Sequence, residues 1–186
     1  EEKLCRLIFL MKILNLSKAY SGVRSELVVH MIKIYNESIV PVIYEQGSLG
    51  ASGDLAPLAH LSLTLIGEGK CYYNNEIIES VSALNSSNIK AMSLEAKEGL
   101  ALLNGTQFSL SHAIIAVDKA RKLYHQANKN VAVAMEAFAC SKQPYHPLVG
   151  KIRNSKSQSQ TAEEILALVN DSKILDIEKY SVQDPY

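Results

Sequence analysis

The chain has 186 residues, 47% of them hydrophobic, and its 19 Lys and Arg residues balance its 19 Asp and Glu residues. A zero formal net charge argues against a basic nucleic-acid-binding protein and gives no reason to expect an anionic membrane as a partner. The length suits a domain of roughly 100–200 residues. We expect residues 1–186 to be a single core segment of a longer chain truncated at both ends, because the sequence begins without Met and ends abruptly at Tyr186.

The cysteines and histidines show no spacing typical of a metal site. Cys5, Cys71 and Cys140 are odd in number and far apart, without a CxxC pair, which predicts buried, inert thiols in a reducing compartment such as the cytoplasm. The five histidines are scattered, so no metal is expected. The apolar run near the N-terminus is short and interrupted by charges, so no membrane span or signal peptide is expected.

Hydrophobic periodicity predicts two amphipathic helices in the first 40 residues. The first is expected to end at Ser21-Gly22 and the second at Pro41. Their apolar stripes are Leu4, Leu7, Ile8, Met11 and Leu14, and Leu27, Val28, Met31, Ile32 and Tyr35.

A glycine-rich loop and a third helix should follow. Residues 44–53 have no helical period, which predicts the loop. Asp54 suits the N-cap of the helix, Pro57 its first turn and Gly67 its C-terminal end. In KCYYNNEIIES, Asn74-Asn75 separates two strand-like runs and predicts a tight hairpin.

The second half reads as almost entirely helical. Ser93 is a candidate cap for a helix that Asn104-Gly105 interrupts. The stretch from Thr106 to about Cys140 lacks Gly and Pro, so we expect one helix of roughly 50 Å at 1.5 Å per residue. Such a rod fits a bundle or an oligomer core.

The remaining C-terminal part offers two further signals. The polar stretch KIRNSKSQSQ, residues 151–160, predicts a mobile loop, and Thr161-x-x-Glu164 is typical of a capping box. The predicted fold is therefore mainly α, a long-helix bundle with one small β-hairpin.

The stretch GSLGASGDLAPLAH, Gly47 to His60, is the candidate site. It is not a P-loop, because no Lys follows the glycines, and neither Ser48 nor Ser52 lies in a GxSxG elbow. On spacing alone it reads as a glycine-rich turn entering a helix.

The same stretch resembles the signature of the histidine ammonia-lyase family, which includes phenylalanine and tyrosine ammonia-lyases and related aminomutases. Three further motifs are similar to those of the family and lie in its order: AYSGVR (19–24), GLALLNGTQ (99–107) and VQDPY (182–186). The resemblance implies that the chain is the central part of the ammonia-lyase fold.

The resemblance also implies a chemistry for the tripeptide. In this family an Ala-Ser-Gly sequence cyclises to the electrophile 4-methylideneimidazol-5-one (MIO), and the matching residues here are Ala51, Ser52 and Gly53. The Gly nitrogen attacks the Ala carbonyl and two waters leave, so no diffusible cofactor and no metal are implied. Asp54 either assists proton movement during ring closure or only caps the next helix.

Other residues take roles by resemblance. Asn104 is implied to hydrogen-bond the ring oxygen, with a simple helix break as its alternative. Gln107 is implied to line the pocket, or else is a surface helix residue. Gln183 and Tyr186 match active-site residues, and Tyr186 is a candidate acid or base. Two residues within these motifs are expected to be structural: His60, and Arg24 as a bidentate partner between loops or subunits.

The favoured substrate is L-histidine, which would give urocanate, because VQDPY is closer to the histidine type than to the plant phenylalanine type, which commonly has another residue where Pro185 stands. A tyrosine or phenylalanine lyase and an aminomutase are the alternatives, and a non-catalytic helical scaffold is the alternative of another class. The resemblance implies a homotetramer. It also implies that the isolated segment is inactive, because the family's substrate-carboxylate arginine lies beyond Tyr186.

Overall fold

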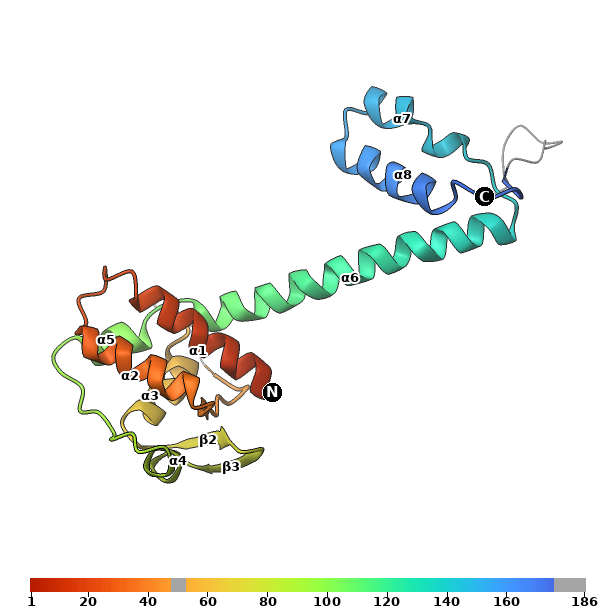
Figure 1. Ribbon diagram of the computed structural model, residues 1–186. Coiled ribbons are helices and arrows are strands. Elements are labelled where there is room, and N and C mark those ends of the chain that lie inside the picture. Colours follow the sequence, from red (N-terminus) through yellow and green to blue (C-terminus); the bar gives the residue numbers. More distant parts are fainter. Residues whose placement is uncertain (48–52, 176–186) are drawn as a thin grey trace. The chain divides into compact units, whose positions relative to one another are not determined.

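The computed structural model describes residues 1–47 and 53–175. The chain divides into two compact units, Glu1–Ala116 and Val117–Tyr186, and the helix α6 (Gln107–Ala137) begins in the first and ends in the second (Figure 1). The first unit also contains α1 (Glu2–Leu16), α2 (Ser25–Asn36), β1 (Val40–Pro41), α3 (Leu55–Leu65), β2 (Lys70–Tyr73), β3 (Glu76–Glu79), α4 (Ser80–Ser86) and α5 (Glu98–Leu103).

The predicted helices of the first unit are present, with two shifted ends and one wrong start. The first helix ends at Leu16 rather than at Ser21-Gly22. The second helix ends at Asn36 rather than at Pro41, because Ser38 turns the chain with a φ of 57° and Pro41 enters the edge strand β1. The helix expected at Ser93 is not formed there. It begins only at Glu98, after Lys97 adopts a left-handed conformation.

The small sheet has the strand order β1-β2-β3, with both pairs antiparallel. Asn74 and Asn75 have φ values of 51° and 66°, as a type I′ hairpin turn requires, so the predicted hairpin is confirmed. The strand β1 adds a third strand that the sequence pattern does not predict.

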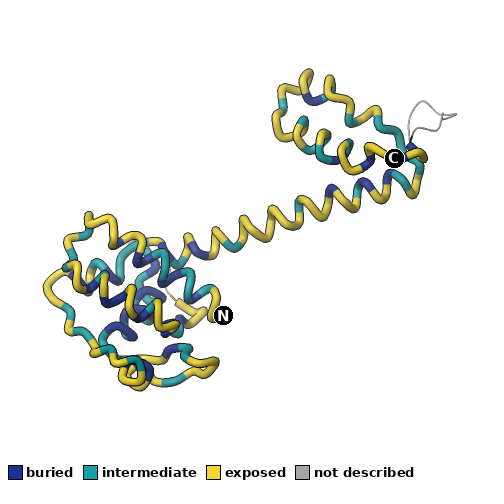
Figure 2. Tube along the Cα trace, in the orientation of Figure 1, coloured by how far each residue is buried: buried dark blue, intermediate teal, exposed yellow. Residues whose placement is uncertain are grey.

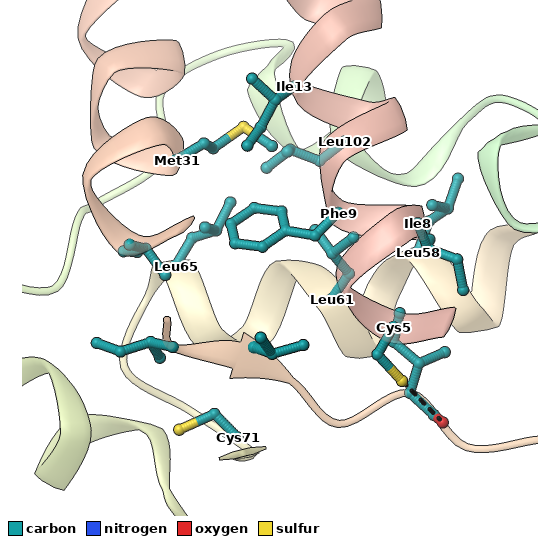
Figure 3. Close-up of a cluster of buried hydrophobic side chains, with 14 of the residues drawn as sticks. Cys5, Ile8, Phe9, Ile13, Met31, Leu58, Leu61, Leu65, Cys71 and Leu102 are labelled. Carbon is teal, nitrogen blue, oxygen red and sulfur yellow. Dashed lines mark hydrogen bonds between the residues drawn. The ribbon is translucent and has the colours of Figure 1, made fainter. Parts of the chain in front are cut away.

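A single apolar core holds the first unit together. Figure 2 shows its buried positions on α1, α2 and α3, and in Figure 3 the side chains of this cluster point toward one another. Phe9 on α1 also meets the ring of Tyr35 edge-on, with centroids 5.8 Å apart. The largest members are Ile8, Phe9, Leu16, Leu27, Met31, Ile34, Ile39, Leu58, Leu61, Leu65 and Leu84.

The second unit contains the 3-10 turn Gln143–Tyr145, α7 (Pro147–Ile152) and α8 (Lys156–Leu168). The predicted mobile loop over residues 151–160 is therefore wrong. The hydroxyl of Ser155 accepts the backbone N–H of Gln158 and caps α8. The predicted capping box is also wrong, because Thr161 lies inside α8 and its hydroxyl donates to the Ser157 carbonyl.

The long helix is confirmed, since α6 runs for 31 residues. Cys5 and Cys71 are buried free thiols, as expected, whereas Cys140 is only half-buried. Within the described ranges, no helix has the length and apolar character needed to cross a bilayer.

Candidate functional site

The candidate site is built around a close contact between two glycines. Gly53 precedes α3, Gly105 lies between α5 and α6, and the two form an isolated parallel β-bridge. Gly53 has a φ of +102°, and a Cβ there would lie 2.5 Å from the Gly105 carbonyl oxygen. Only glycine permits both this conformation and this approach. The preceding residues of the tripeptide, Ala51 and Ser52, lie outside the described residues.

Asp54 adds two links to the same turn. Its backbone N–H donates to the Gly105 carbonyl at 3.0 Å. Its carboxylate is 3% exposed and accepts both the backbone N–H of Ser109, at 2.9 Å, and the Ser109 hydroxyl, at 2.8 Å. Asp54 therefore occupies the N-cap position of α3 but makes no side-chain cap bond there, and it caps the first turn of α6 instead.

Asn104 is the C-terminal cap residue of α5, and both its side chain and its backbone bond to the helix. Its Nδ2 and its backbone N–H both donate to the Leu100 carbonyl, at 2.9 and 3.1 Å. The Leu100 carbonyl takes one of the two N–H bonds on Nδ2, so the amide keeps a second donor for a ligand. The residue is thus the C-terminal cap of α5, as the alternative reading held.

The side chain that supports Asn104 was missed in the sequence. Lys12 of α1 is fully buried, and its Nζ donates to the Asn104 carbonyl oxygen at 2.7 Å. Burial lowers the pKa of its ammonium to about 8. The available signal was helical spacing, because Lys12 lies four residues after Ile8 on the face that α1 buries.

Gln107, the first residue of α6, is buried, so its reading as a surface residue is wrong. Its Oε1 has no hydrogen-bond partner among the described residues and lies beside Gly105, where a Cβ would overlap it. His60 packs edge-on against Tyr44, with ring centroids 5.0 Å apart, and burial lowers the pKa of its imidazole.

Arg24 ties the segment before α5 to the start of α2. Its Nε and Nη2 donate to the two carboxylate oxygens of Glu98 at 2.8 and 2.7 Å, and its Nη1 reaches Glu95 at 2.8 Å. The bidentate hydrogen bonds from the Arg24 guanidinium lower the pKa of Glu98 to about 2. The predicted bidentate pairing of Arg24 is confirmed, with Glu98 at the first position of α5 as its partner, and the Ser93 carbonyl also accepts from Arg24.

The structure thus brings Gly53, Asp54, Asn104 and Gln107 together around the Asn104-Gly105 turn. The other implied residues, Gln183 and Tyr186, lie outside the described residues. In the described part of the chain no three side chains are grouped as ligands for a metal ion. The second N–H of the Asn104 amide and the Oε1 of buried Gln107 are the side-chain polar atoms left for a further hydrogen bond beside this turn.

Comparison with known proteins gives concordant results. The chain matches the family described as aromatic amino acid lyase over residues 1–186. It is similar to the histidine ammonia-lyase of Legionella pneumophila (strain Corby), with 41% identity over 182 residues covering 97% of this chain and 36% of that protein. The chain spans only about a third of the length of such relatives.

Two solved structures are similar in both sequence and fold. The histidine ammonia-lyase of Trypanosoma cruzi aligns with a TM-score of 0.83 and 34% identity, covering 90% of this chain and 33% of that one. The phenylalanine aminomutase of Pantoea agglomerans aligns with a TM-score of 0.87 and 32% identity, covering 92% of this chain and 33% of that one.

Proposed function

The chain belongs to the aromatic amino acid lyase family, and from this we propose that it is the core segment of a longer ammonia-lyase that converts L-histidine to urocanate. The observation that carries the proposal is the contact between Gly53 and Gly105, because it lies at the end of the Ala51-Ser52-Gly53 tripeptide and tolerates no side chain. Relatives named histidine ammonia-lyase, with 37–41% identity, support L-histidine as the substrate.

The described residues fit an MIO group, on which the family in general depends. Gly53 has the backbone freedom and the missing Cβ that ring closure needs. In that closure the Gly53 nitrogen bonds to the Ala51 carbonyl carbon, one water leaves, and loss of the Ser52 hydroxyl as a second water makes the exocyclic alkene. The finished group supplies a carbon electrophile, which ordinary side chains do not provide.

Each neighbouring residue then has a defined task. The Asn104 amide would donate a hydrogen bond to the ring oxygen and would stabilise negative charge there, as an oxyanion-hole donor does. Asp54 supports ring formation by holding the Gly53–Gly105 contact to the first turn of α6. Gln107 and Gln183 are assigned to substrate binding. Tyr186 serves as an acid or base, and action as a base at neutral pH requires its pKa to lie below the ordinary value near 10.

The proposal includes a homotetramer in the cytoplasm and no metal or diffusible cofactor. The similarity to a phenylalanine aminomutase favours one second candidate, an aminomutase that uses the same tripeptide and adds ammonia back at the neighbouring carbon.

The test uses the full-length protein and its Ser52→Ala variant. We expect the intact mass of the wild type to be lower than its sequence mass by two waters at the tripeptide, and we expect a near-ultraviolet absorbance that Ser52→Ala lacks. Ser48→Ala, four residues earlier in the sequence, is the matched control and should keep both signals. A wild type without the water loss would leave the helical scaffold as the explanation.

Substrate identity is measured by offering L-histidine, L-tyrosine and L-phenylalanine in parallel. Release of ammonia with formation of urocanate supports the histidine assignment. A β-amino acid product identifies the aminomutase, and deamination of tyrosine or phenylalanine alone refutes L-histidine as the substrate.

A further inference from the structure

Lys12 is a buried cation that the stability of the core does not explain. It lies on α1 between the buried side chains of Ile8 and Leu16, and it is itself fully buried. Its Nζ forms no ion pair with any carboxylate in residues 1–47 and 53–175, and the Asn104 carbonyl is its hydrogen-bond acceptor. Burying a charge on one neutral acceptor is unfavourable compared with an apolar side chain of similar volume.

We propose that Lys12 is a positioning residue for the active site, because its ammonium fixes the Asn104-Gly105 turn on which Gly53 of the tripeptide lies. The inference rests on the proposed function and adds to it a residue from α1, far from the motifs in sequence. Lys12 acts through Asn104 and Gly105 and is not assigned a contact with the substrate.

The contacts form a continuous path from Lys12 to the tripeptide. Nζ holds the carbonyl oxygen of Asn104 at 2.7 Å, and the next carbonyl, that of Gly105, accepts the backbone N–H of Asp54 at 3.0 Å. The β-bridge joins Gly105 directly to Gly53. Two consecutive carbonyls of one turn are therefore fixed, one by α1 and one by the residue that follows the tripeptide.

This path bears on the reaction because Asn104 must present its amide at a fixed place. Hydrogen bonds to a developing negative charge stabilise it only when the donor is already oriented. A charged hydrogen bond is also stronger than a neutral one and resists rotation of the turn. The lowered pKa of about 8 leaves the ammonium mostly protonated at neutral pH, so this bond is present under ordinary conditions.

The test measures turnover and water loss in the full-length protein carrying Lys12→Met or Lys12→Arg. Met keeps most of the volume without the charge, and Arg keeps the charge and the donors. Lys3→Met, an exposed lysine on the same helix, is the matched control. We expect Lys12→Met to fold and to lower kcat about 10- to 100-fold, which corresponds to the loss of one charged hydrogen bond. KM should stay within about threefold of wild type. Lys12→Arg should recover part of the loss, and Lys3→Met should match wild type.

Three results would decide against the inference. A folded Lys12→Met protein with wild-type kcat and complete water loss shows that Lys12 is only a core residue. A fall in melting temperature with unchanged kcat leads to the same conclusion. If Lys12→Met does not fold, Lys12→Gln, which keeps a neutral donor, takes its place, and wild-type kcat in that variant overturns the proposal. Failure of the proposed function is distinguishable, because the wild type itself then shows no water loss and no ammonia release.

Discussion

The carboxylate of Asp54 caps a helix that begins 52 residues later than its own: it accepts the backbone N–H of Ser109, at 2.9 Å, in the first turn of α6. Both carboxylate oxygens are bound by Ser109, since the hydroxyl donates to Oδ1 at 2.8 Å and to Oδ2 at 2.9 Å. This contact joins the starts of α3 and α6 and so holds the Gly53–Gly105 bridge between them.

The contact predicts how Asp54 variants will behave. Asp54→Ala removes the cap and should lower the free energy of unfolding by about 1–2 kcal/mol, and it should also reduce water loss at the tripeptide. Asp54→Asn keeps an acceptor for the Ser109 N–H, so both properties should stay close to wild type. Thermal melting and intact-protein mass give the two readouts.

The paired substitutions also separate the two readings of Asp54. Ser109→Ala removes the hydroxyl but keeps the backbone donor, and it serves as the mild control. If Asp54→Asn folds normally yet fails to lose water, the carboxylate moves protons during ring closure and the positioning account of Asp54 is wrong.

A second prediction concerns the glycine contact. Gly53→Ala must place a Cβ 2.5 Å from the Gly105 oxygen at a φ of +102°, so we expect a loss of at least about 2 kcal/mol of stability and no ring closure. The matched control is Gly99→Ala in α5, where a Cβ meets nothing within 4 Å. That control should be neutral or up to about 1 kcal/mol more stable, as Ala replaces Gly in a helix. Water loss in a Gly53→Ala protein would contradict the required close approach.

Local signals were enough to predict much of the fold. The Asn74-Asn75 turn and the Gly- and Pro-free stretch of α6 were recognisable because each depends on residues adjacent in sequence. The predicted set of inward-facing positions on α1 was partly wrong. Leu14 is half exposed and Lys12 is buried, because packing against α2, β1 and the Asn104-Gly105 turn decided which face points inward.

The candidate site was only partly predictable for the same reason. The Gly53-Asp54 and Asn104-Gln107 motifs were visible as short sequences, but their meeting depends on contacts across more than 50 residues. Ser109 and Lys12 carry no motif, so only the structure assigns them. The polar stretch 151–160 misled the prediction because the exposed start of a surface helix has the composition of a loop.

A third prediction follows from the ion pair of Glu98, whose side chain is 1% exposed. Its pKa is about 2 when folded, against an ordinary value of 4.5, so the stabilisation is complete above pH 4.5 and is lost as pH falls toward 2. Glu98→Gln should lower stability by about 1.5–3 kcal/mol at neutral pH and remove this part of the acid sensitivity. Glu95 pairs with the same Arg24 but is 64% exposed, so Glu95→Gln should change stability by less than about 1 kcal/mol. Equal effects of the two substitutions in acid and thermal melts would refute the assignment.

The last prediction is the pH dependence that Lys12 imparts to stability. Its pKa is about 8 when folded and near the ordinary 10.5 when unfolded, so between these values the unfolded chain binds a proton that the folded chain lacks. Stability from this group therefore rises with pH across that window and is constant below it. Relative to Lys12→Met, the wild type should gain about 2 kcal/mol between about pH 7 and about pH 9.5. Melting temperatures of the two proteins at both pH values measure the difference, with Lys3→Met as the reference. If the difference in melting temperature between the two proteins is the same at both pH values, the Lys12 ammonium is not buried in the folded protein.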